Sequence, residues 1–177
     1  MADGMKIKTE KILHFSNPAL RTECQPVTVF HKGLHNKIET MAYTLDQHGG
    51  GAALAAPQIG ILKRIVVINY LGRYFELINP EISDGTGSVV EYEGCLSLPG
   101  YVGLVKRYRK VKVGYRNRFG EPVEVDVKNE MARCFQHEID HLSGTLYIDR
   151  MTDGCLINPD TGEKVDVEKI QALTRGA

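Results

Sequence analysis

The chain has 177 residues, a length that suits one compact domain burying roughly two-thirds of its unfolded surface, so we expect a single domain over residues 1–177. Its 22 basic residues balance 22 acidic residues, and no block of like charge stands out. Neither nucleic acid nor an anionic membrane is therefore expected as a partner.

The N-terminal segment carries no export signal. Residues 1–10 mix charged and polar side chains and lack the apolar run of a signal peptide, and no later stretch approaches the roughly 20 apolar residues that span a bilayer. We expect a flexible extension over residues 1–10 and a cytoplasmic protein. In that compartment, we expect the irregularly spaced Cys24, Cys95, Cys134 and Cys155 to be free thiols, available as metal ligands or nucleophiles, rather than disulfide partners.

The first predicted helix covers residues 31–48. Its apolar side chains recur at helical spacing and define one buried stripe: Leu34, Ile38, Met41, Ala42 and Leu45. Glycines at 49–51 end this helix, and the small residues at 52–56 leave room for the backbone to pass close to another group.

The remaining elements predict an α+β fold. Residues 64–70 and 74–78 are rich in β-formers, and residues 110–115 and 123–127 alternate apolar with polar side chains around a turn at 117–120. Helical spacing returns over residues 130–142, and residues 151–177 form a tail with a short helix near 167–173. We expect antiparallel or mixed sheets wrapped around the helix over 130–142.

That central helix carries the clearest chemical motif. His137 and His141 are four residues apart, so both imidazoles lie on one helical face, about 6 Å apart along the axis, and can bind one metal ion. Glu138 lies beside them as a candidate general base and acid for hydrolysis. A catalytic site of this kind needs a third protein ligand and an open position.

Several residues are candidates for the third ligand. A third histidine six residues after the second is absent, because that position is Tyr147. Glu163 is in range but falls in a turn-rich tail. Cys134 is about 10.5 Å from His141 along the helix axis, too far for both to bind one metal ion. Cys95 follows a glycine at the end of an apolar strand, which alone is a weak signal.

Three segments together resemble the peptide deformylase family. They are residues 51–58, the Glu-Gly-Cys-Leu-Ser motif at 93–97, and the His-Glu-Ile-Asp-His motif at 137–141. The family's three motifs occur in this order at comparable spacing. The resemblance implies a metallohydrolase that removes the N-formyl group from the formyl-methionine of newly made polypeptides and releases formate.

The resemblance also implies the roles of individual residues. Cys95, His137 and His141 would bind the metal, with water in the fourth position, and Glu138 would move the proton. The side-chain amide of Gln58 and the backbone N–H of Leu96 would donate hydrogen bonds to the oxyanion of the tetrahedral intermediate.

The substrate backbone is expected beside Gly51, Ala53 and Gly94. The family's first motif has a glycine where this chain has Ala53. An added methyl group near the substrate would narrow the cleft, so we expect altered affinity or selectivity. Glu130 also places a charge where an apolar methionine pocket would be simpler, and it could point to the rim instead.

The expected metal is one divalent ion. The family resemblance implies Fe²⁺, with Zn²⁺, Ni²⁺ or Co²⁺ able to substitute. We expect Glu93 and Arg107 to form a salt bridge that supports the site without taking part in catalysis. The expected partners are formyl-methionyl nascent peptides, together with a possible contact to the ribosome.

Two alternative functions remain open. The first is a zinc peptidase that uses Glu163 as its third ligand, and the second is a non-catalytic metal-binding domain that kept the fold without the activity. Loss of metal on replacing Cys95, rather than Glu163, would separate the first from a deformylase.

Overall fold

A computed structural model describes residues 7–49 and 51–175 of the chain. The helices are η1 (Pro18–Arg21), α1 (Lys32–Gln47), η2 (Ala56–Ile59), α2 (Glu130–His141), η3 (Tyr147–Asp149) and α3 (Val167–Arg175). The strands are β1 (Ala53–Ala55), β2 (Ile65–Tyr70), β3 (Arg73–Thr86), β4 (Val89–Cys95), β5 (Leu98–Arg107), β6 (Lys110–Arg116), β7 (Pro122–Lys128), β8 (Cys155–Ile157) and β9 (Lys164–Asp166).

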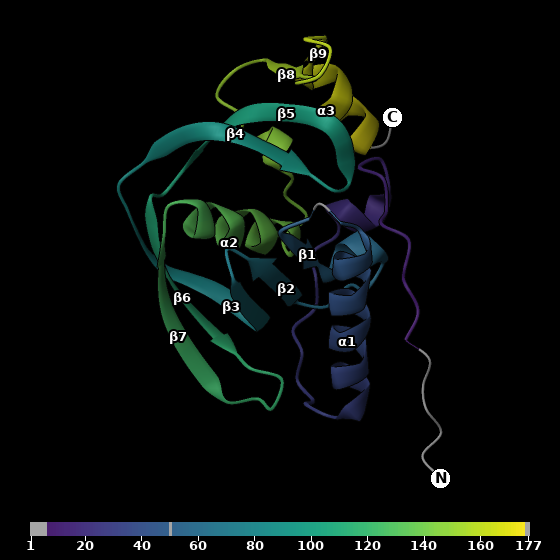
Figure 1. The fold of residues 1–177 in the computed structure, drawn as a ribbon, viewed down its shortest axis with the longest axis vertical. Coiled ribbons are helices and arrows are strands. Elements are labelled where there is room, and N and C mark those ends of the chain that lie inside the picture. Colours follow the sequence, from purple (N-terminus) through teal and green to yellow (C-terminus); the bar gives the residue numbers. More distant parts are fainter. Residues whose placement is uncertain (1–6, 50, 176–177) are drawn as a thin grey trace.

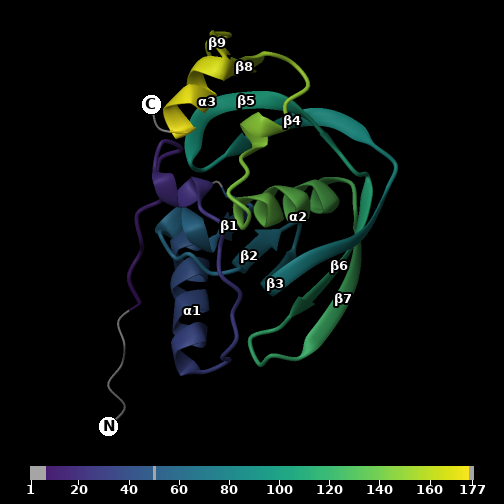
Figure 2. The ribbon, with the colours of Figure 1, turned by 180° about the vertical axis from the view of Figure 1, so that it is seen from behind.

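The strands form two sheets with α2 between them. One sheet has the order β1-β2-β3-β6-β7 and the other the order β4-β5-β8-β9, and the named strands pair antiparallel. Figures 1 and 2 show α2 enclosed between β4 and β5 on one side and the larger sheet on the other. The predicted α+β fold with sheets around a central helix is therefore confirmed.

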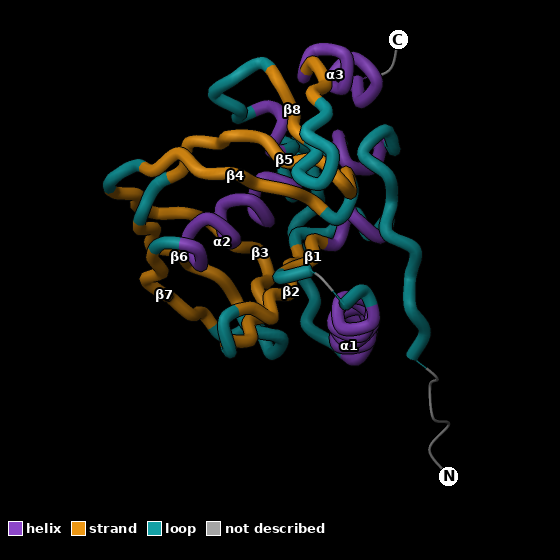
Figure 3. The backbone as a smooth tube through the Cα atoms, turned by 45° about the horizontal axis from the view of Figure 1, so that its top comes forward, coloured by secondary structure: helices purple, strands orange, loops and turns teal. Residues whose placement is uncertain are grey.

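The larger sheet is buried on both of its faces at β2. Val66 and Ile68 pack into the cluster shared with α2, whereas Ile65 and Val67 pack into the cluster shared with α1. Successive strand residues point to opposite faces, so the continuous apolar run of β2 serves two cores at once. Figure 3 shows α1 and α2 on opposite sides of β1 and β2.

Apolar residues of α2 hold it against the larger sheet. Phe135 is fully buried, and its ring meets Phe75 of β3 edge to face with centroids 5.1 Å apart. Burying one such aromatic side chain stabilises the fold by about 2–3 kcal/mol. The helix ends before Gly144, whose φ of 67° is left-handed. A Cβ there would lie 2.6 Å from the carbonyl oxygen of Arg21, so this stop position requires glycine.

Arg21 connects the C-terminal helix α3 to η1 and η3 through hydrogen bonds and an ion pair. Its guanidinium pairs with Asp149 of η3, donates to Thr174 Oγ1 of α3 and donates to the carbonyl of Gly144. The predicted tail therefore packs against the body. No helix in the described ranges combines the length and apolar character needed to cross a bilayer.

Sequence periodicity located some elements better than others. The helices predicted over 31–48 and 130–142, the hairpin over 110–127 and the short helix near 167–173 are confirmed. β3 is longer than the predicted strand over 74–78, and β5 was not predicted. Of the predicted extension over 1–10, residues 1–6 lie outside the described residues, and residues 7–10 have no regular secondary structure.

Candidate metal and catalytic site

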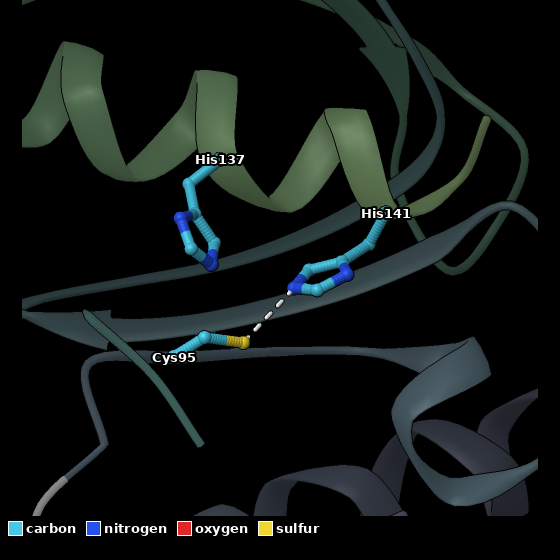
Figure 4. A group of neighbouring side chains, drawn as sticks. All are labelled: Cys95, His137 and His141. Carbon is cyan, nitrogen blue, oxygen red and sulfur yellow. Dashed lines mark hydrogen bonds between the residues drawn. The ribbon is translucent and has the colours of Figure 1, made fainter. Parts of the chain in front are cut away.

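Three predicted ligands converge between α2 and the end of β4. The ligand atoms of Cys95, His137 and His141 lie within 4.8 Å of one another, and Cys95 Sγ is 3.4 Å from His141 Nε2. Figure 4 shows both imidazoles reaching from α2 toward the sulfur. Two ligands bound about 2.2 Å from one tetrahedral ion are about 3.6 Å apart, so this spacing matches a shared metal.

Local structure explains why these side chains meet. The two histidines lie one helical turn apart on α2, with ring centroids 5.0 Å apart. Cys95 is the last residue of β4 and pairs with Leu98 across a tight turn, where the strand register shifts between Glu93 and Cys95. This irregularity turns the cysteine toward the helix.

The chemistry of the donors also fits a transition metal. Two imidazole nitrogens and one thiolate suit zinc, ferrous iron, nickel or cobalt. Burial and the neighbouring His137 lower the pKa of His141 well below its ordinary value, so its ring is neutral and offers a lone pair. His141 is 1% exposed, so its ring is packed within the protein.

Glu93 orients His137. Its Oε2 lies 3.0 Å from His137 Nδ1, while Arg107 donates to both carboxylate oxygens at 2.8 and 3.0 Å and Arg133 donates to Oε1 at 2.8 Å. Burial alone would raise the pKa of Glu93, but hydrogen bonds from His137 and Arg107 hold it well below its usual range. The carboxylate therefore keeps the proton on Nδ1 and leaves Nε2 for the metal.

The expected pairing of Glu93 with Arg107 is confirmed, and the structure extends it. Arg107 also donates to Asp140 at 2.5 Å, and Arg150 donates to the two Asp140 oxygens at 2.5 and 2.7 Å. Because Asp140 lies in α2 next to His141, this network of ion pairs connects the helix that carries the two histidines to β4 and β5.

Glu138 is placed for proton transfer. Its side chain lines the cleft beside the metal ligands, the residue is 6% exposed, and its Oε2 has no hydrogen-bond partner among the described residues. Burial raises the pKa of Glu138 to about 7. A carboxyl group with this pKa can both take and return a proton near neutral pH.

Gln58 is held with its donor group facing the ligands. Its Oε1 accepts a hydrogen bond from the Ala55 backbone N–H at 2.8 Å. The amide nitrogen therefore faces Cys95 Sγ at 3.5 Å and Ser97 Oγ at 3.3 Å. Ser97 was not singled out from the sequence, although it lies in the Glu-Gly-Cys-Leu-Ser motif.

A cleft of about 460 Å³ opens above the ligands. The expected site residues along its wall are Gly51, Ala53, Gln58, Gly94, Cys95, Leu96, His137 and Glu138. Tyr70, Tyr92 and Arg133 line the same cleft and were not predicted. A Cβ on Gly51 would lie 2.7 Å from Leu96 Cδ1 and 2.9 Å from Leu45 Cδ1, so a larger residue at this position would require the ends of these two leucine side chains to move.

The other residues considered as a third metal ligand do not join the converging ligand atoms. Glu163 is exposed and accepts a hydrogen bond from Tyr101 at 3.4 Å, and it is not in the group of converging ligands. Cys134 lines the cleft but is likewise outside that group. Tyr147 stacks beside His137 with centroids 6.0 Å apart, which restrains that ring.

The chain resembles known proteins over most of its length. Residues 9–156 match the family model described as polypeptide deformylase. A peptide deformylase from Heliobacterium modesticaldum is 45% identical over 141 residues, which cover 80% of this chain and 93% of that relative. One from Thermoanaerobacter pseudethanolicus is 47% identical over 131 residues, covering 74% of this chain and 82% of the relative.

Solved structures give the same result. The crystal structure of peptide deformylase from Thermotoga maritima superposes with a TM-score of 0.80 at 40% identity and covers 82% of this chain and 99% of that chain. A deformylase from Synechococcus elongatus, solved in complex with actinonin, superposes with a TM-score of 0.78 at 33% identity and covers 86% of this chain and 87% of that chain.

Proposed function

Because the chain belongs to the polypeptide deformylase family, we propose that Cys95, His137 and His141 bind one divalent metal ion and that Glu138, Gln58 and Leu96 act on the substrate there. The reaction of this enzyme is hydrolysis of the N-formyl group from the formyl-methionine of a newly made polypeptide, which releases formate. The observation that carries the residue assignment is the convergence of the three ligand atoms within 4.8 Å beside the buried Glu138.

Glu138 handles the proton throughout the reaction. The ion held by the three ligands would polarise the formyl carbonyl and acidify a nearby water molecule. Glu138 accepts a proton from that water molecule while the oxygen of the water bonds to the formyl carbon. When the bond between the formyl carbon and the amide nitrogen breaks, Glu138 returns the proton to the leaving amine. The products are formate and a free methionyl N-terminus.

Gln58 and Leu96 stabilise the charge that develops on the formyl oxygen. The amide nitrogen of Gln58 is fixed toward the ligands by its hydrogen bond with Ala55, so it costs no reorganisation during the reaction. Leu96 follows Cys95 directly and lines the cleft, and its backbone N–H supplies the second donor. Donors placed in advance at such an oxygen typically contribute about 3–4 kcal/mol each.

Ferrous iron is the metal we propose for the site. Imidazole and thiolate donors accept iron, zinc, nickel and cobalt, and the preference for iron follows from membership of the family. We further propose that residues 1–177 form one catalytic domain, that it works in the cytoplasm and that its substrate is presented by a nascent chain near the ribosome.

The test is formate release from formyl-Met-Ala-Ser by protein purified without oxygen. Glu138→Ala, Cys95→Ala and Cys134→Ala are measured beside the parent, with metal content assayed in each. We expect activity in the parent and in Cys134→Ala. Glu138→Ala should keep metal but lose activity, and Cys95→Ala should lose both. A parent fully loaded with iron that releases no formate would contradict the proposal.

The same assays, with Glu163→Gln added to the set of variants, test the two rival functions. A zinc peptidase using Glu163 would keep its metal in Cys95→Ala and lose it in Glu163→Gln. A metal-binding domain without activity would not need Glu138 at the base of the cleft or Gln58 fixed toward the ligands. The exposed position of Glu163, in contact with Tyr101, disfavours the first rival.

A further inference from the structure

One part of the cleft wall comes from the C-terminal segment of the chain. Pro159 lines the cleft together with residues 99–102 of β5. It lies in the turn between β8 and β9, whereas the match to the family model ends at residue 156. Pro159 is therefore supplied by a segment beyond the region that the family model matches.

β5 bulges where it borders the cleft. Glu93 pairs with Gly103, and two residues later Cys95 pairs with Leu98. The ladder thus advances from residue 93 to 95 on β4 while it advances from residue 103 to 98 on β5. The extra residues of β5 leave the ladder, and they are residues 99–102, which line the cleft.

The hairpin of β8 and β9 packs on this bulge. Ile157 of β8 pairs with Val102, and the Tyr101 hydroxyl donates to Glu163 Oε2 at 3.4 Å. Figures 1 and 2 show β8 and β9 next to β5, at the end of the molecule that also carries α3. Contacts from two neighbouring bulge residues therefore hold the hairpin against the cleft wall.

Hydrogen bonds restrain the turn that carries Pro159. Asn158 Oδ1 accepts from the backbone N–H groups of Asp160 and Thr161 at 2.9 and 3.1 Å, and the Asn158 carbonyl accepts from the N–H of Gly162 at 2.8 Å. The proline ring fixes its own φ, and Gly162 supplies a left-handed φ of 73°. Because Pro159 is held in place before a peptide binds, contact with it requires little further ordering of the protein.

A bound peptide can reach this wall with the residue that follows the formyl-methionine. Successive side chains of an extended peptide point to opposite sides. With the methionine side chain against α2, where Cys134 lines the cleft, the second side chain points toward the bulge and Pro159. The side chains that the wall presents there are Pro99, Tyr101, Val102 and Pro159, and none of them carries a charge.

We propose that the β5 bulge and Pro159 form a subsite for the second residue of the formyl-peptide and that this subsite favours an apolar side chain. The inference rests on the proposed function, because it requires the formyl group at the metal ligands. Pro159 is exposed, so an apolar side chain placed against it removes apolar surface of both partners from water. A polar side chain would lose water there without gaining a hydrogen bond from the proline ring.

The experiment measures kcat/KM for two pairs of peptides whose members differ in polarity but little in size. Formyl-Met-Leu-Ser is compared with formyl-Met-Asn-Ser, and formyl-Met-Ala-Leu is compared with formyl-Met-Ala-Asn. The first pair tests the second residue, and the second pair tests the third residue. Each pair is measured with the metal-loaded parent, Pro159→Ala, Pro159→Asp and a control variant.

We expect Pro159→Ala to lower the preference for leucine in the first pair by roughly 2- to 5-fold, because it removes two methylene groups that are partly covered by the peptide. Pro159→Asp should lower it further, since a carboxylate beside leucine would lose hydration. The ratio of the second pair should stay unchanged in both variants.

Pro122→Ala is the matched control. Pro122 is also exposed and also belongs to a hairpin, as the first residue of β7, but it lies outside the cleft lining. Its replacement removes the same fixed φ from the unfolded and folded chain, so it reports any general effect of losing a proline. It should leave both ratios unchanged.

The possible failures look different. If the metal-loaded parent cleaves formyl-Met-Ala-Ser but Pro159→Ala leaves the first ratio unchanged, shifts only the second ratio, or shifts the first no more than Pro122→Ala does, the apolar subsite is wrong and the deformylase assignment stands. If the metal-loaded parent releases formate from none of the peptides, the proposed function fails, and the subsite fails with it.

Discussion

Glu93 Oε2 lies 3.0 Å from His137 Nδ1, and the same carboxylate is held by two arginines from different elements, Arg107 of β5 and Arg133 of α2. The orientation of one proposed metal ligand is thus fixed by a buried ion network that joins a strand pair to the central helix. Metal binding and stability should therefore be coupled at this residue.

Replacing Glu93 tests that coupling. Glu93→Gln keeps the shape of the side chain but removes the carboxylate that the buried Arg107 and Arg133 share, so we expect about 3–5 kcal/mol loss in the free energy of unfolding. Metal affinity should fall about 10- to 100-fold, because His137 loses its orienting carboxylate. Calorimetry and metal titration measure the two effects.

The matched control, Glu124→Gln, removes an exposed carboxylate paired with Lys112 and should change the free energy of unfolding by less than about 1 kcal/mol.

The same carboxylate should make the protein sensitive to acid. The pKa of Glu93 is lowered in the folded state, so its contribution to stability is present above the unfolded pKa of about 4.3 and is lost as the pH falls through the folded pKa. The free energy of unfolding should thus decrease more steeply below about pH 4 in the parent than in Glu93→Gln. Equal slopes in acid titrations of the two proteins would contradict this explanation.

Glu138 should have the opposite effect on stability in metal-free protein. Burial raises its pKa to about 7, so folding is penalised once the pH exceeds the unfolded value, and stability falls as the pH rises from about 4.5 to 7. Glu138→Gln removes this penalty. We expect it to raise the Tm of metal-free protein more at pH 8 than at pH 5. A gain that does not depend on pH would show that the carboxyl group is not desolvated as described.

Gln58 should affect the rate of reaction more than the binding of metal. Its amide nitrogen faces the cleft side of Cys95, so Gln58→Leu should lower kcat by roughly 10²- to 10³-fold while metal content stays unchanged. Ser97→Ala, which removes the acceptor of the second Gln58 hydrogen bond, should have a smaller effect. Loss of metal in Gln58→Leu would assign the residue to the structure of the site instead.

Ala53 should influence substrate affinity. Its side chain is 6% exposed in β1, opposite Ile68, and the residue lines the cleft. Ala53→Gly should change KM or selectivity among formyl-peptides, at a stability cost of roughly 1 kcal/mol for glycine in a strand. Kinetics unchanged by Ala53→Gly would refute a role in selectivity.

The sequence by itself determined the parts of this protein that depend on local spacing. A period of 3.6 residues predicted the two long helices, alternation predicted the hairpin of β6 and β7, and the i, i+4 relation of His137 and His141 placed two imidazoles on one face. These patterns are readable because backbone geometry alone converts spacing into direction.

Only the tertiary structure decided which distant residues meet. Cys95 and His141 are 46 residues apart in sequence but 3.4 Å apart in space, and nothing in the local pattern of β4 fixes that approach. The sequences of β1 and β5 show no clear alternation of apolar and polar residues. All three side chains of β1 are buried, and the buried positions of β5 are irregularly spaced along the strand. The helical spacing of Glu130 is compatible with the cleft or with its rim, and its place in the cleft depends on how α2 packs between the sheets. Such contacts are set by packing of the whole chain, and for that reason spacing along the sequence did not predict them.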